Sequence, residues 1–197
     1  MADIRRRAAA LGRNPADLLI FTLATVIPAE TDAAARDKLA EYRRHIDHEG
    51  ALALFSGWTG IDFSGVDPDE PIRYIKNDAM VSAVESFTTA DPDRVWTIRE
   101  IAEHVGIGGR GPVFVGSAAT IADEMQGWVA ETGIDGFNLA YAVAPESFVD
   151  FVDLVVPELQ RRGAFKQEYA PGTYREKLFG AGRARLPDEH PAARWRR

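Results

Sequence analysis

The chain has 197 residues, of which 46% are hydrophobic and 27% are charged, a composition that excludes a disordered protein and suffices for a packed core. Its net charge of -7 argues against a general nucleic-acid binder, and the absence of cysteine excludes disulfides, thiolate catalysis and cysteine-bound metals. No apolar run at the N-terminus resembles a signal peptide, and the longest apolar stretch, residues 18–27, is too short to span a bilayer. The sequence therefore predicts a cytoplasmic protein without nucleic-acid or membrane partners.

The first predicted element is a short helix over residues 3–11, which Gly12 ends because glycine readily takes the left-handed conformation found after helices. Residues 18–27 form a continuous apolar run without polar alternation. Such a run is typical of a strand that is buried on both faces of a parallel sheet. Thr31 then predicts the N-cap of a helix that extends to about residue 45.

Residues 47–112 interrupt this alternation of strands and helices. Segment 55–62 is interpreted as a loop, whereas helices are predicted over residues 78–87 and 97–104. The glycine-rich run 106–112 predicts a flexible joint. An insertion of this length in a compact domain is typical of a lid or a binding loop.

Regular elements return after the insertion. Residues 113–116 predict a short strand, Ser117 caps the helix that follows, and residues 136–143 predict a third strand before a last helix. The inner faces of the two helices are expected to be Ile121, Met125, Trp128 and Val129 in the first, and Phe148, Phe151, Val152, Val155 and Leu159 in the second, with a kink at Pro157.

Three strands, each followed by a helix, predict an α/β fold with a parallel sheet in residues 1–164. The polar, glycine-punctuated residues 165–197 are expected to form a tail outside the core. A parallel barrel requires eight strands, so three strands cannot close one. An open parallel sheet has unpaired edges, and we therefore expect the chain to aggregate or to seek a partner.

Sequence motifs occur at several places along the chain: residues 49–62, Gly116-Ser117 with 121–125, 135–139, 148–163, 172–179 and 185–194. Together these segments closely resemble the C-terminal part of the bacterial luciferase-like flavin monooxygenases. The resemblance is nearest to the branch that holds the long-chain alkane, nitrilotriacetate and dibenzothiophene-sulfone monooxygenases.

The resemblance implies the C-terminal portion of a (β/α)8 TIM barrel, with the three strands as the sixth, seventh and eighth and residues 47–112 as a lid. Family members use O2 and reduced FMN, which a separate flavin reductase supplies, to oxygenate a small organic substrate. The phosphate-binding loop after the fifth strand has no counterpart here, so we expect the isolated chain to bind FMN weakly or not at all. Relatives are typically dimers or larger, which implies a homo-oligomer or pairing with the missing barrel half, with the tail 165–197 as a subunit contact.

Gly116 and Ser117 are the candidate cofactor-binding residues because they follow a strand and open a helix, where backbone N–H groups can hold an anion. An ordinary N-cap is the alternative interpretation. A substrate pocket is predicted from aromatic residues and a histidine of the insertion, together with polar residues late in the last strand. The alternative is that these residues pack the lid onto the barrel. These candidates are Phe55, Trp58, Trp96, His104, Asn138 and Tyr141.

Two further motifs are not expected to carry chemistry. His45 and His48 lie one helical turn apart, but no third ligand has a suitable spacing, so no metal site is predicted. Gly106, Gly108 and Gly111 match the pattern G-x-G-x-x-G, but they precede a strand instead of following one, which favours a hinge over a phosphate cradle.

Two functions follow from these observations. The chain is the C-terminal part of an FMN-dependent, two-component monooxygenase, or it is a non-catalytic remnant or interaction module without the flavin site. Ala51 and Leu54 stand where some alkane-oxidising relatives carry histidines, which leaves the substrate class open. In either case the strands are expected to lie parallel and adjacent in chain order, with the insertion above their C-terminal edge and with open flanks on the first and third strands.

Overall fold

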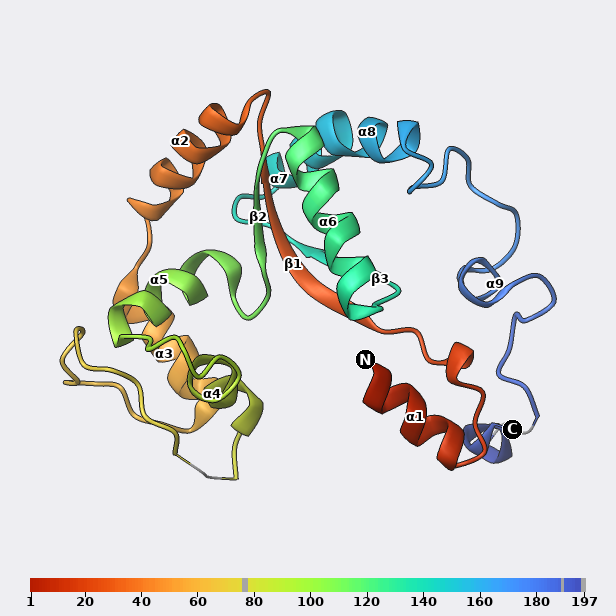
Figure 1. Ribbon diagram of the computed structural model, residues 1–197, viewed down its shortest axis with the longest axis horizontal. Coiled ribbons are helices and arrows are strands. Elements are labelled where there is room, and N and C mark those ends of the chain that lie inside the picture. Colours follow the sequence, from red (N-terminus) through yellow and green to blue (C-terminus); the bar gives the residue numbers. More distant parts are fainter. Residues whose placement is uncertain (76–77, 189, 196–197) are drawn as a thin grey trace.

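A parallel sheet of three strands organises the molecule (Figure 1). The computed structural model describes residues 1–75, 78–188 and 190–195. The strands are β1 (Phe21–Pro28), β2 (Val113–Gly116) and β3 (Gly136–Ala140), and β1 pairs in parallel with both of the others. The predicted parallel α/β sheet is confirmed.

The order of the strands is β2-β1-β3, so the prediction that they lie adjacent in chain order is wrong. The first strand is central, and the open edges belong to β2 and β3. The burial of β1 gives the physical reason, since its residues from Ala24 to Pro28 are all buried. The longest apolar strand loses the most water-exposed surface when it has a neighbour on each side, whereas β2 and β3 are only partly buried and suit the edges.

The described part of the chain also contains twelve helical segments, two of which are the short 3-10 helices Pro15–Asp17 and Pro191–Trp195. The helices that flank the sheet begin at side-chain caps, because Thr31 accepts from the N–H of Ala34 and Ser117 accepts from the N–H of Thr120. In chain order the helices are α1 (Ala2–Ala10), α2 (Asp32–Arg43), α3 (His48–Thr59), α4 (Val81–Thr88), α5 (Ile98–Gly108), α6 (Ala118–Thr132), α7 (Glu146–Asp150), a π-helical segment (Phe151–Val155), α8 (Val156–Arg161) and α9 (Tyr174–Phe179).

One face of the sheet packs against α6, the π-helical segment and α8. Ala24, Val26 and Phe114 point into this core, where they meet buried residues such as Ile121 and Val155. Successive strand residues point to opposite faces, so the neighbours of Phe114 on β2 face the side of α2. Figure 1 shows α2 on one side of the strands and α6 with α8 on the other.

The last helix departs from its predicted face. Pro157 has no N–H and its ring displaces the carbonyl one turn earlier, and the chain before it widens into the π-helical segment. The buried stripe runs through Ser147, Phe151, Val155 and Leu159. Phe148 and Val152, which were expected inside, are 40% and 56% exposed because they lie one position around the helix from this stripe.

The inner face of α6 is likewise narrower than predicted. Ile121, Ala122 and Met125 are buried, whereas Trp128 and Val129 are 37% and 40% exposed. The edge of the Trp128 ring still meets the ring of Phe114, with 6.1 Å between the ring centres.

The insertion has a hydrophobic core of its own, formed by α3, α4 and α5. Phe55 is fully buried at its centre, with its ring centre 5.4 Å from that of Phe63 and 5.5 Å from that of Phe87. The interpretation of residues 55–62 as a loop is wrong, since α3 continues to Thr59. Asp47 caps the start of α3, and Gly60 ends the helix at a φ of 66°. The apolar residues between them supply a buried face, and its burial outweighs the low helix propensity of Gly50 and Gly57 within α3.

The glycine-rich run is a close-packed junction and not a flexible joint. Gly108 is the last residue of α5, and a Cβ at this position would lie 2.5 Å from the side chain of Val113. A Cβ at Gly111 would collide with the carbonyl group of Leu23 in β1. Gly111 needs glycine because two backbones approach each other closely there, whereas Gly108 leaves room for the side chain of Val113.

The same contacts place the insertion at the N-terminal end of β2, not above the C-terminal edge of the sheet as expected. The chain enters β2 beside the middle of β1, where the N–H of Thr25 donates to the carbonyl of Pro112 over 2.9 Å. Figure 1 shows α3, α4 and α5 at the end of the sheet remote from the start of α2. The reason is topological, because α2 runs back along the sheet and the next parallel strand must begin at the far end.

The tail curves around the opposite side of the molecule and returns to the N-terminal segment (Figure 1). Arg183 forms an ion pair with Asp17 over 2.9 Å, and none of the buried hydrophobic residues of the described chain lies beyond Leu159. No helix in the described ranges combines the length and the apolar character that a bilayer crossing requires.

Candidate functional site

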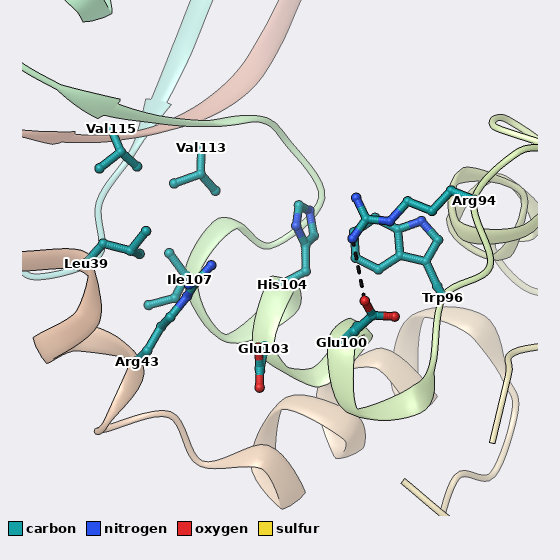
Figure 2. A pocket seen from close by; sticks show the side chains of 10 residues that line it. All are labelled: Leu39, Arg43, Arg94, Trp96, Glu100, Glu103, His104, Ile107, Val113 and Val115. Atoms are coloured by element: carbon teal, nitrogen blue, oxygen red, sulfur yellow. Dashed lines mark ion pairs between the residues drawn. The ribbon is translucent and has the colours of Figure 1, made fainter. Parts of the chain in front are cut away.

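A cavity of about 460 Å3 lies between the sheet and the insertion (Figure 2). Its floor is aliphatic: Val113 and Val115 come from the face of β2 opposite Phe114, and they meet Leu39 of α2 and Ile107 of α5. The cavity therefore uses the face of the sheet that the main core leaves free. The remaining lining residues are Arg43, Arg94, Trp96, Glu100, Glu103 and His104.

Helix α5 supplies one wall through four residues on one face: Glu100, Glu103, His104 and Ile107. Their spacing of three, four and seven positions brings them to one side of a helix. The start of α5 is fixed by a capping box, in which Thr97 accepts from the N–H of Glu100 and the Glu100 carboxylate accepts from the N–H of Thr97.

The aromatic wall consists of Trp96 and His104, whose ring centres are 5.5 Å apart at a steep angle. Phe87 supports both rings from behind, at 5.0 Å from Trp96 and 5.5 Å from His104. The guanidinium group of Arg94 lies over the indole at 3.4 Å from its centre and 3.9 Å from Glu100. Figure 2 shows Arg94, Trp96 and His104 side by side at one end of the cavity.

The pKa of His104 is lowered, first by burial of the ring and second by the positive charge of Arg94. No other described residue forms a hydrogen bond with its imidazole nitrogens. A neutral imidazole of this kind has one N–H donor and one acceptor free for a bound molecule. The cavity thus combines an aliphatic floor with a polar group that can orient a ligand.

We expect the stability of the protein to fall as the pH drops below about 6.5, the ordinary pKa of histidine. In that range the unfolded chain binds a proton at His104 and the folded chain does not, so acid favours unfolding. The slope due to this residue is at most about 1.4 kcal/mol per pH unit and is reduced by the partial exposure of the ring. Urea unfolding at a series of pH values between about 5.5 and 7.5 measures it.

His104→Phe keeps the ring contacts with Phe87 and Trp96 and removes the titrating group. Its unfolding free energy should vary less with pH than that of the unchanged protein. The other histidines are the same in both proteins, so the comparison isolates position 104. Equal pH slopes for the two proteins would contradict the assignment.

The structure brings together two of the six predicted pocket residues, Trp96 and His104. Phe55 lies in the core of the insertion, and Trp58 packs against that core. Asn138 is exposed on the edge strand β3, and Tyr141 follows it with 56% exposure and a ring contact to Phe148. These four residues do not line the cavity.

Gly116 and Ser117 do open α6, but the anion position at this helix terminus is held by a carboxylate of the same chain. The N–H of Ser117 donates to Asp32 Oδ1 over 2.7 Å, and the hydroxyl of Thr120 donates to the same oxygen over 2.8 Å. The Ser117 N–H, followed by the Thr120 hydroxyl, lowers the pKa of Asp32 and keeps it charged. A flavin phosphate does not fit beside this carboxylate, so these two residues form an N-cap and not a phosphate cradle.

Arg43, Glu100, Glu103 and the two valines of β2 were missed by sequence reasoning. The capping box followed by residues at helical spacing was a usable signal for the wall on α5. The side chains from α2 and β2 gave no local signal, because only the folded chain brings them opposite α5.

No group of three or more His, Asp or Glu side chains suited to a metal ion occurs in the described part of the chain. His45 forms an ion pair with Glu41 in α2 and has a side chain that is 73% exposed. His48 lies 4.0 Å from Glu103.

Comparison with curated proteins finds clear relatives, although no protein-family model matches the chain. Over 194 residues the chain is 47% identical to dimethyl-sulfide monooxygenase of Hyphomicrobium sulfonivorans and 42% identical to long-chain alkane monooxygenase of Geobacillus thermodenitrificans. Each match covers 98% of this chain and 40% of the relative. The chain therefore spans about two fifths of the length of these curated relatives.

Solved structures agree with these relatives. The crystal structure of DmoA from Hyphomicrobium sulfonivorans matches with a TM-score of 0.83, at 47% identity, over 99% of this chain and 41% of that protein. A riboflavin lyase solved with modified FMN and riboflavin matches with a TM-score of 0.80 at 28% identity, over 100% of this chain and 43% of that one. The chain belongs to the luciferase-like flavin monooxygenase family and corresponds to the C-terminal part of its members, as the sequence motifs predicted.

Proposed function

We propose that this chain is the pocket-forming C-terminal part of a two-component monooxygenase that oxygenates a small organic substrate with O2 and reduced FMN. The observation that carries the proposal is the cavity between the sheet and the insertion, in a chain whose relatives are monooxygenases. In the same proposal β1, β2 and β3 belong to a (β/α)8 barrel, and the insertion covers the cavity beside the start of β2.

The aliphatic floor of the cavity and His104 support an apolar substrate with a polar atom, and the charged side chains lie on the other walls. Leu39, Val113 and Val115 offer apolar contact, while the neutral His104 can donate or accept one hydrogen bond. Dimethyl sulfide, which the most identical of these relatives is named for, has this character and is the first substrate to try.

The flavin itself is proposed to bind mainly to residues outside this chain, and a separate flavin reductase is proposed to supply it in reduced form. The carboxylate of Asp32 occupies the N-terminus of α6, which the sequence had suggested as a site for the flavin phosphate. Bound flavin would supply the activation of O2. The isolated chain should therefore bind FMN weakly or not at all.

A chimera tests the proposal. This chain replaces the matching 194-residue segment of dimethyl-sulfide monooxygenase, and substrate oxidation is measured with FMN, NADH and a flavin reductase. We expect flavin-dependent consumption of substrate by the chimera, and no saturable quenching of FMN fluorescence by the isolated chain at micromolar concentration.

Variants of the chimera locate the pocket. Trp96→Leu and His104→Phe should lower substrate turnover, whereas Trp195→Leu, at a residue that is 75% exposed and remote from the cavity, should not. A chimera that binds FMN but oxidises neither dimethyl sulfide nor a long-chain alkane would favour the second function, a non-catalytic interaction module.

The second function has one observation in its favour, the exposed aromatic residues of the tail. Tyr169, Tyr174 and Trp195 are 80%, 75% and 75% exposed, and a partner that covered them would remove apolar surface from water. We propose that residues 165–197 contribute to self-association. Deleting them should lower the mass measured by light scattering, and an unchanged oligomer would contradict this role.

A further inference from the structure

A second cavity lies between the N-terminal segment and the tail, which Figure 1 shows on the side of the molecule away from the insertion. Its volume is about 480 Å3. Arg13, Asn14 and Asp17 line it from the N-terminal segment, and Arg175 and Arg183 line it from the tail. Two segments that are about 160 residues apart in sequence, the N-terminal segment and the tail, thus line the same cavity.

Two of the three arginines are gathered on one aromatic ring. The guanidinium group of Arg175 lies 4.3 Å from the centre of the Phe179 ring, and that of Arg183 lies 5.4 Å from it. The ring attracts each cation, but it does not neutralise the repulsion between them. Like charges held this close are stabilised when an anion lies between them.

Asp17 is the only acidic residue in the described lining of the cavity, against three arginines. Asp17 pairs with Arg183 over 2.9 Å, whereas Arg13 and Arg175 have no ion-pair partner among the residues that the structure describes. The Nε of Arg175 is buried and donates to no described group. An unpaired buried donor on a charged group costs free energy, which a bound acceptor would recover.

The carboxylate next to Arg175 in sequence is engaged elsewhere. Glu176 accepts from the backbone and hydroxyl of Thr173 at the start of α9, and its other oxygen accepts from the N–H of Gly182 over 3.1 Å. The pKa of Glu176 is lowered, first by the Thr173 backbone N–H. Asp188 and Arg185 line the adjoining cavity.

His190 completes the lining from the end of the tail. Its Nδ1 accepts from the N–H of Ala192 over 3.1 Å, which leaves the proton of the neutral ring on Nε2. The described lining thus holds several N–H donors and one carboxylate, in a protein whose net charge is -7.

We propose that this cavity is a binding site for a phosphate-class oxyanion, held by Arg13, Arg175 and Arg183. Guanidinium groups match the oxygens of a phosphate and bind them through paired hydrogen bonds, and the excess of more than one positive charge favours a dianion over a carboxylate. The cavity is larger than a phosphate ion, so a phosphate ester fits as well as inorganic phosphate. The site does not depend on the monooxygenase activity.

Titration calorimetry of the full chain with inorganic phosphate, and separately with glycerol 3-phosphate, tests the site and distinguishes the two sources of the anion. Sodium chloride holds the ionic strength constant. We expect saturable binding of one anion per chain, and stronger binding of the ester identifies an organic phosphate as the ligand. Affinity should fall by at least about tenfold in Arg175→Gln, the loss of one charge-assisted contact.

Two variants keep the result interpretable. Arg13→Gln removes an exposed cation without touching the tail, and it should lower the affinity by a similar factor even if Arg175→Gln fails to fold. Arg73→Gln removes the same charge from the insertion, where its side chain is 81% exposed, and should leave the affinity unchanged. No saturable binding of either phosphate, equal binding of chloride, or an equal loss in Arg73→Gln would overturn the proposal.

Discussion

Phe55→Ala is expected to destabilise the insertion by about 3–5 kcal/mol, the range for removing a fully buried aromatic side chain from a core. The ring has no exposed surface and lies against both Phe63 and Phe87, so the truncation leaves a void between α3 and α4. Denaturant unfolding gives the magnitude, and hydrogen exchange shows where protection is lost.

The loss should be local. Phe55 belongs to a cluster that shares no residue with the core under α6 and α8, so the amides of α3 and α5 should lose more protection than those of α6. Leu54→Ala is the matched control, because Leu54 is the next residue back on the same helix and is 49% exposed. Its effect should be within about 0.5–1 kcal/mol. Uniform loss of protection over both cores would contradict the two-core arrangement.

Gly111→Ala should disrupt the junction between the insertion and the sheet, at a cost at or above the upper end of the range of about 1–3 kcal/mol for overpacking. The added methyl group would meet the backbone carbonyl of Leu23, and a backbone atom cannot move aside by rotating a side chain. The ladder hydrogen bond from Thr25 to Pro112 lies next to the clash and should weaken with it. The unfolding midpoint and the exchange of the Thr25 amide measure both effects.

The same substitution at position 57, Gly57→Ala, is expected to stabilise the protein instead of destabilising it. Gly57 lies within α3, and a Cβ there would meet nothing within 4 Å. Alanine should therefore stabilise the protein by up to about 1 kcal/mol, since it forms helices more readily than glycine. If Gly111→Ala were as harmless as Gly57→Ala, the close approach of the two backbones would be refuted.

Much of the local structure is determined by the sequence itself. The apolar run that becomes β1, the strand 113–116 and the caps at Thr31 and Ser117 were all predicted, and the structure confirms them. Caps and strand patterns depend on residues within a few positions of each other, so a linear sequence contains the information. The family motifs could also be recognised in the sequence, because sequence identity to a relative over 194 residues requires no knowledge of contacts.

The tertiary structure alone decided the strand order and the position of the insertion. Pairing between β1 and β3 depends on which arrangement buries the most surface, and that is a property of the whole sheet. It also decided the candidate sites. Trp96 and His104 become a wall only when β2 and α2 face them, and Ser117 loses its free N–H only because Asp32, distant in sequence, reaches the same helix terminus. Such contacts join residues far apart in the chain, and no local pattern encodes them.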